Sequence, residues 1–129
     1  MELAKLREAM TSLERAPYLL TVGDDRRAHC VATPCRWRGD ELELEVGNRT
    51  LANAAVHPAV SLLWPPNEAD GYSLIVDAEV TSTEGSGAGD NIVRARPSAA
   101  VLPRPAAGGP VTEGCTADCV PLLDRATGD

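Results

Sequence analysis

The chain has 129 residues, enough for one domain with one core and too few for two ordinary domains. Its formal net charge of −7 and its single lysine, Lys5, exclude a phosphate-tracking nucleic-acid surface, which needs clustered basic side chains. No run approaches the roughly 18 apolar residues that span a membrane, and the first five residues lack the pattern of a signal peptide, so we expect a cytoplasmic protein without a membrane partner.

The first half of the chain predicts one helix followed by strands. An apolar stripe at steps of three and four, formed by Leu3, Leu6, Met10 and Leu13, predicts an amphipathic helix that ends before Pro17. In 41–46, glutamates alternate with aliphatic residues, which predicts a strand with one buried and one wet face. The strands expected in this half are 18–23, 28–37 and 41–46.

The second half predicts a short internal helix, three more strands and a tail. The helix has an apolar side and closes at His57-Pro58. The strands are expected at 59–64, 72–83 and 91–102. From Pro103 onward, Pro and Gly recur every few residues, which predicts irregular structure. Six strands in hairpin order indicate a small antiparallel barrel over 1–104, with an irregular C-terminal tail over 105–129.

Aromatic residues are scarce, with two Trp, two Tyr and no Phe. The core must therefore be built from Leu, Val, Ile and Ala, and a platform for stacking bases is not expected. Trp64 closes a predicted strand just before Pro65-Pro66. A partner or a ring could pack on it there, or it could be an ordinary core anchor.

The segment Gly47-Asn48-Arg49-Thr50 opens the short helix directly after strand 41–46. The first N–H groups of a helix lack intrahelical partners and point at one spot, so such a start suits an anion such as a cofactor phosphate. Gly47 lets the backbone turn, and Asn48 can cap the helix. The alternative is an ordinary helix start with a solvated Arg49.

The series PYLLTVG, RAHCVATP, WRGDELEL, GNRTLAN and HPAVSLLW, taken in this order, resembles the pyridoxamine 5'-phosphate oxidase-like, FMN-binding split-barrel family. The resemblance runs from about Pro17 to about Arg104. It implies a mainly β fold, a six-stranded antiparallel split β-barrel with an N-terminal helix and one short internal helix. It also implies a homodimer whose pocket is shared between two subunits.

The resemblance further implies an FMN cofactor, or an 8-hydroxy-5-deazaflavin cofactor, and an oxidoreductase role on a small-molecule substrate. In the family the flavin ring lies along one strand and the phosphate lies at the start of the internal helix. The cofactor-binding residues expected here are Val31, Ala32, Thr33 and Pro34 beside the ring, Glu45 and Val46 along the path, Arg49, Thr50 and Asn53 at the phosphate, and Trp64.

The sequence departs from the family at the phosphate. Many members carry a Ser/Thr-x-Lys unit there, and no lysine follows Lys5 in this chain. Arg49 must then carry the phosphate charge, or the site is weakened or empty. The second reading is a cofactor-free dimeric barrel that serves as a ligand-binding or scaffold module.

Residues for acid–base or metal chemistry are few. No Ser–His–Asp order stands out, His29 lies on a predicted strand and His57 at a helix end, so we assign no catalytic residue. In an oxidoreductase the flavin itself would perform the hydride chemistry. Cys115 and Cys119 could form part of a zinc site, a disulfide or two reduced thiols, and we predict no metal site.

Overall fold

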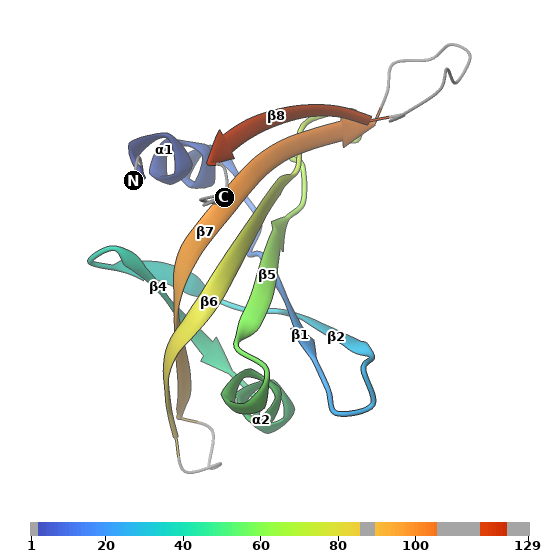
Figure 1. Ribbon diagram of the computed structural model, residues 1–129. Helices are drawn as coiled ribbons and strands as arrows, with labels where there is room; N and C mark the ends of the chain where they lie inside the picture. Colours follow the sequence, from blue (N-terminus) through green and yellow to red (C-terminus); the bar gives the residue numbers. More distant parts are fainter. Residues whose placement is uncertain (1–2, 86–89, 106–116, 124–129) are drawn as a thin grey trace, which may run out of the picture.

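The computed structural model describes residues 3–85, 90–105 and 117–123, which form two helices and an antiparallel sheet of eight strands (Figure 1). In chain order the elements are α1 (Ala4–Ser12), β1 (Tyr18–Val22), β2 (Ala28–Ala32), β3 (Cys35–Arg38), β4 (Glu41–Val46), α2 (Asn48–Val56), β5 (Ala59–Trp64), β6 (Leu74–Glu84), β7 (Asn91–Pro105) and β8 (Ala117–Leu123). None of the described helices is long and apolar enough to cross a membrane.

The expected number of six strands is corrected to eight. The stretch 28–37, predicted as one strand, is divided into β2 and β3 by Thr33 and Pro34. Proline has no N–H to donate to a strand ladder, which favours a break at this point. The eighth strand, β8, lies inside the segment expected to be irregular, where it pairs with β7. Residues 106–116 and 124–129 of that segment lie outside the described residues.

The strand order explains why the barrel is split. The main path runs β2-β1-β5-β6-β7-β4-β3, so β2 and β3 lie at its opposite edges. These two strands are nevertheless joined by only two residues, Thr33 and Pro34. The sheet must therefore curl until its edges approach each other, and because β2 and β3 do not pair, a seam stays open between them.

The core is aliphatic, as the composition predicts. In β4, Leu42 and Leu44 are fully buried and Glu45 on the other face is exposed, but Glu43 is buried, so the predicted wet face is confirmed at Glu45 and is wrong at Glu43. Leucine and valine side chains from α1 and from four strands complete the core: Leu6, Leu19, Leu62, Leu74, Val76 and Val93 are each 0% exposed. Burying each such side chain stabilises the fold by about 1.5–3 kcal/mol.

The two helices lie at opposite ends of the sheet in Figure 1, α1 near β8 and α2 at the other end. α1 is held at two points. Arg7 Nη2 donates to the carbonyl of Gly39 at 2.6 Å, with its guanidinium 4.0 Å above the Trp37 ring. At the end of α1, Asn67 Nδ2 donates to the carbonyl of Ser12 at 2.8 Å, so the β5–β6 loop fixes the helix terminus.

Candidate functional site

The start of α2 is open to an anion, although not in the way the sequence suggests. Gly47, not Asn48, occupies the N-cap position, in an extended conformation and without a side-chain cap. Asn48 Oδ1 instead accepts a hydrogen bond of 2.9 Å from Nδ2 of Asn91, so the expectation that Asn48 caps the helix is wrong. No atom outside the adjacent residues lies within 4 Å of where a Cβ on Gly47 would stand. The space beside Gly47 at the helix start is therefore open.

The three residues expected at a phosphate differ sharply in environment. Arg49 is exposed and makes no hydrogen bond or ion pair with any residue that the structure describes. Thr50 is only 2% exposed, so its hydroxyl is withdrawn from the surface. Asn53 donates through Nδ2 to Oγ1 of Thr21 at 3.1 Å, which ties α2 to β1. Arg49 is thus the cation of this group that is free for a ligand.

The residues expected beside a ring lie at a sheet edge. Val31 and Ala32 end β2, which in the described sheet pairs with β1 alone. An edge strand leaves alternate backbone N–H and C=O groups free on its outer side. Thr33 is buried, and its N–H donates to the carbonyl of Pro17 at 2.9 Å. Hydrogen bonding to a ring would therefore have to use the free side of β2.

A small hollow lies beside the β2–β3 link and the strands β3 and β4. Its volume is about 170 Å³, and Pro34 and Glu45 both line it. Glu45 lies two residues before the cap of α2 in the chain, but no residue of α2 is among those that line the hollow. Val46 and Trp64 belong to the buried core instead, with Trp64 only 3% exposed. The burial of Trp64 favours the core anchor of its two readings, and its contact with a cofactor stays a prediction.

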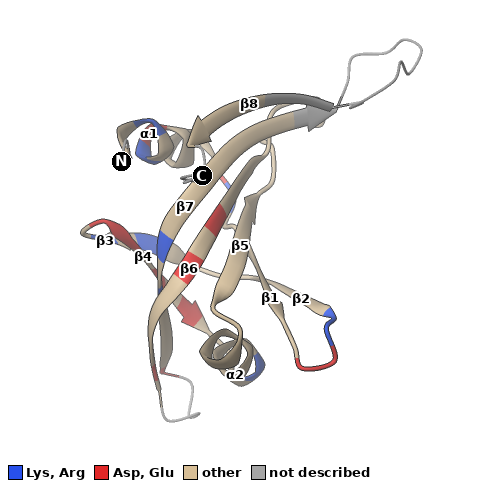
Figure 2. Ribbon diagram, in the orientation of Figure 1, with Lys and Arg blue, Asp and Glu red and all other residues tan. Residues whose placement is uncertain are grey.

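Three arginines converge on Glu43 beside the hollow, and sequence reasoning missed this cluster. Glu43 is 4% exposed, and its Oε1 accepts from Arg36 Nε at 2.8 Å and lies 2.6 Å from Arg36 Nη2. Oε2 lies 3.0 Å from Arg94 Nε and 3.5 Å from Arg38 Nη1. Arg94 also pairs with Glu84. Figure 2 shows basic residues on β7 beside acidic residues on β6.

These contacts set the protonation of the cluster. Hydrogen bonds from Arg36, and then from Arg94, hold the pKa of Glu43 below its usual value of 4.5. Glu43 therefore stays ionised and occupies arginines that would otherwise be free for a ligand. Cys35 also lines the hollow, but burial raises the pKa of its thiol to about 12. A thiol with this pKa stays protonated at neutral pH and is a poor nucleophile.

The remaining candidate groups offer little chemistry. His57 caps the C-terminus of α2, with Nε2 3.1 Å from Oδ1 of Asp24. Within 3–85, 90–105 and 117–123, no three His, Cys, Asp or Glu residues gather as metal ligands. Cys115 lies outside these residues, and only the backbone of Cys119 is described, opposite Pro103 in the β7–β8 ladder.

An apolar row crosses the outer face of the sheet. Neighbouring strands place its members opposite one another, on the face away from the core. We call these residues the outer row: Ala32, Tyr18, Leu63, Ile75 and Val101. Tyr18 is 41% exposed, and Leu63 at the centre is half-buried. Such a continuous apolar row is typical of a surface that meets a partner.

Comparison with known proteins identifies relatives and a fold. No family model matches the chain. It is 38% identical over 117 residues to the uncharacterized protein Mb0449c of Mycobacterium bovis, covering 80% of this chain and 82% of the relative. The uncharacterized protein MT0457 of Mycobacterium tuberculosis matches to the same extent.

Two solved structures have the same architecture at low identity. A protein from Listeria innocua, described as a candidate pyridoxamine 5'-phosphate oxidase, superposes with a TM-score of 0.63 at 14% identity, covering 78% of this chain and 98% of the other. An F420 reductase superposes with a TM-score of 0.57 at 20% identity, covering 70% and 93%. The chain therefore belongs to the family of the two mycobacterial proteins, and it has the split-barrel fold of pyridoxamine 5'-phosphate oxidase-like proteins.

Proposed function

We propose that this protein binds FMN or a deazaflavin at the start of α2 and acts as an oxidoreductase on a small molecule. The observation that carries the proposal is the uncapped helix start beside an unpaired, exposed Arg49. Free N–H groups, the positive end of the helix dipole and a guanidinium together suit a phosphate. The names of the two structural neighbours, an F420 reductase and a candidate pyridoxamine 5'-phosphate oxidase, support this class of cofactor.

The residues present fit a phosphate-bearing cofactor in two further respects. The space beside Gly47 is open, so a phosphate can approach the backbone of the helix start. The free edge of β2 offers backbone groups, and the hollow lined by Pro34 and Glu45 offers room beside the β2–β3 link. When bound, the flavin or deazaflavin supplies the hydride transfer, and the chain supplies binding and orientation.

The proposal includes a homodimer with the cofactor between the subunits. The outer row gives each subunit an apolar surface for an isologous contact, in which the same patch meets its symmetry mate. The seam between β2 and β3 opens the barrel at the edge where the ring would lie. A second subunit would then close the cofactor site from outside.

A cofactor-free barrel is the second candidate, and one observation favours it. Glu43 already occupies Arg36, Arg38 and Arg94, so Arg49 would have to neutralise a phosphate without help from this cluster. In that case the barrel would serve as a dimeric scaffold or ligand carrier.

Titration of the purified protein separates the two candidates. The full chain is mixed with FMN, with the deazaflavin, and with riboflavin as the phosphate-free control, and binding is followed by flavin fluorescence and isothermal calorimetry. Saturable binding of FMN or the deazaflavin, at one cofactor per subunit and more tightly than riboflavin, is the expected result. If neither phosphate-bearing cofactor binds more tightly than riboflavin, the phosphate site at α2 is wrong and the cofactor-free barrel is favoured.

A further inference from the structure

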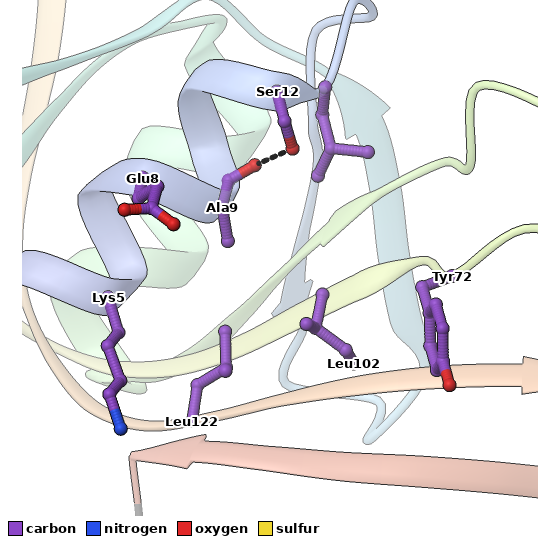
Figure 3. A pocket seen from close by; sticks show the side chains of 8 residues that line it. Lys5, Glu8, Ala9, Ser12, Tyr72, Leu102 and Leu122 are labelled. Atoms are coloured by element: carbon purple, nitrogen blue, oxygen red, sulfur yellow. Dashed lines mark hydrogen bonds between the residues drawn. The ribbon is translucent and has the colours of Figure 1, made fainter.

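A second cavity lies between α1 and the strands β7 and β8, at the opposite end of the sheet from α2 (Figures 1 and 3). Its volume is about 460 Å³, within the range of sites that hold small molecules. α1 contributes Ala9 and Leu13 to its wall, and the strands contribute Leu102 and Leu122. Tyr72 stands at one end in Figure 3, and the lining is predominantly apolar.

The cavity is preformed because α1 is anchored away from it. Arg7 attaches the helix to the β3–β4 turn, Asn67 fixes its C-terminus, and Leu6 is fully buried in the core. None of these three residues lines the cavity. The helix therefore cannot move onto the strands to close the space without breaking these contacts.

A single cation stands at the end of the cavity away from Tyr72. Lys5, the one lysine of the sequence, is exposed and makes no hydrogen bond or ion pair with any described residue. In Figure 3 its side chain extends beside Leu122 toward β8. Glu8, one turn along the helix, also borders the cavity, but its carboxylate points in a different direction from the Lys5 ammonium and forms no ion pair with it.

We propose that this cavity binds an aliphatic monocarboxylate, with the carboxylate at Lys5 and the hydrocarbon body between α1 and the strands. The apolar wall from Leu102 and Leu122 matches a hydrocarbon chain, whose burial is favourable in proportion to its area. The unpaired ammonium at one end matches one carboxylate. This site is independent of the cofactor site proposed at α2.

The test uses decanoate as the probe and decanol as its uncharged counterpart, each titrated into the full chain by calorimetry below the concentration at which it aggregates. Decanoate should bind saturably at one molecule per chain. The change Lys5→Met, which keeps the apolar stem, should weaken decanoate about threefold, as expected for one solvent-accessible ion pair. Decanol binding should be unchanged by the same substitution.

Two substitutions that fill the cavity test whether decanoate binds inside it. Ala9→Trp and Ser12→Trp place a large ring in the space and should each weaken decanoate at least tenfold. Ala4→Trp and Thr11→Trp, at exposed positions of the same helix that do not line the cavity, should bind decanoate as the unmodified protein does. Circular dichroism confirms the fold of each variant, and either filled variant suffices if the other does not fold.

Each remaining outcome overturns a stated part of the proposal. If decanoate does not bind saturably to the full chain, the proposed site is wrong. The same conclusion holds if the chain itself fills the cavity. Equal binding by the filled variants and their controls shows that decanoate binds elsewhere. An identical response of decanoate and decanol to Lys5→Met overturns the assignment of the carboxylate to Lys5.

Discussion

Arg49 occupies the second position of α2, with an exposed side chain that pairs with no described residue. If it holds a cofactor phosphate, Arg49→Ala removes a charge-assisted contact worth about 2 kcal/mol, or about thirtyfold in affinity. We expect weaker FMN binding by calorimetry and unchanged riboflavin binding, because riboflavin lacks the phosphate.

Arg15→Ala is the matched control, since Arg15 is also an exposed arginine without a partner among the residues that the structure describes, but follows α1. It should leave FMN affinity unchanged. Equal FMN affinity of the Arg49→Ala and the unmodified protein would remove Arg49 from the site and leave it a solvated residue of the helix start.

Glu43 makes stability depend on pH in a defined direction. Its pKa in the folded protein is below the usual 4.5, mainly because of the hydrogen bond from Arg36, so its ionised form stabilises the fold. This contribution is complete above the unfolded pKa and is lost as the pH falls through the folded pKa. Glu43→Gln should therefore lower the free energy of unfolding at neutral pH, and the difference should shrink below about pH 4.5.

Urea unfolding of the two proteins at a series of pH values measures this difference. Glu14→Gln, at an exposed glutamate whose side chain makes no described ion pair, serves as the control. A difference between Glu43→Gln and the unmodified protein that stays constant from neutral to acid pH would show that the ion pairs of Glu43 do not stabilise the fold.

At the scale of elements, the β6–β7 hairpin determines how α2 begins. Gly85 follows β6 at a φ of +146°, which favours glycine. A Cβ at this position would lie 2.2 Å from Oδ1 of Asn91, the residue whose amide holds Asn48. Gly85→Ala should therefore destabilise the fold by about 2 kcal/mol or more, measured as a lower Tm.

Gly47→Ala is the matched control for this hairpin. Gly47 has a φ of −82°, and nothing beyond its chain neighbours lies within 4 Å of an added Cβ, so the substitution should cost less than about 1 kcal/mol. If both alanine variants unfold at the same temperature, the hairpin tolerates the side chain and does not constrain Asn91.

At the scale of the whole molecule, the outer row predicts a homodimer. Light scattering at micromolar concentration should give twice the chain mass of 13.6 kDa. Leu63→Arg places a charge at the centre of the outer row and should yield a folded monomer, because an unpaired charge buried in an interface is costly. Thr11→Arg, on the exposed side of α1, should remain dimeric. A monomer mass for the unmodified protein contradicts both the dimer and a cofactor site shared between subunits.

Much of the fold is predictable because its signals are local. The alternation in 41–46 reports which residues face the core, and the stripe from Leu3 to Leu13 reports one face of α1. The break at Thr33 and the strand β8 could not be predicted in this way, because both depend on where the strands lie in the sheet. Thr33 and Pro34 separate two strands at opposite edges of the sheet, and β8 contains Pro121, which a strand with a free edge can accommodate.

The sequence by itself determined the aliphatic core, the helix start at Gly47–Thr50 and the resemblance to the split-barrel family, because periodicity, turn residues and the order of motifs are properties of neighbouring positions. Only the tertiary structure decided that Thr50 and Trp64 are buried while Arg49 stays exposed and unpaired. It also brought Arg94 to Glu43, 51 residues away in the chain. Burial and such contacts depend on how the sheet curls and which strands become neighbours, and no local pattern in the chain encodes that geometry.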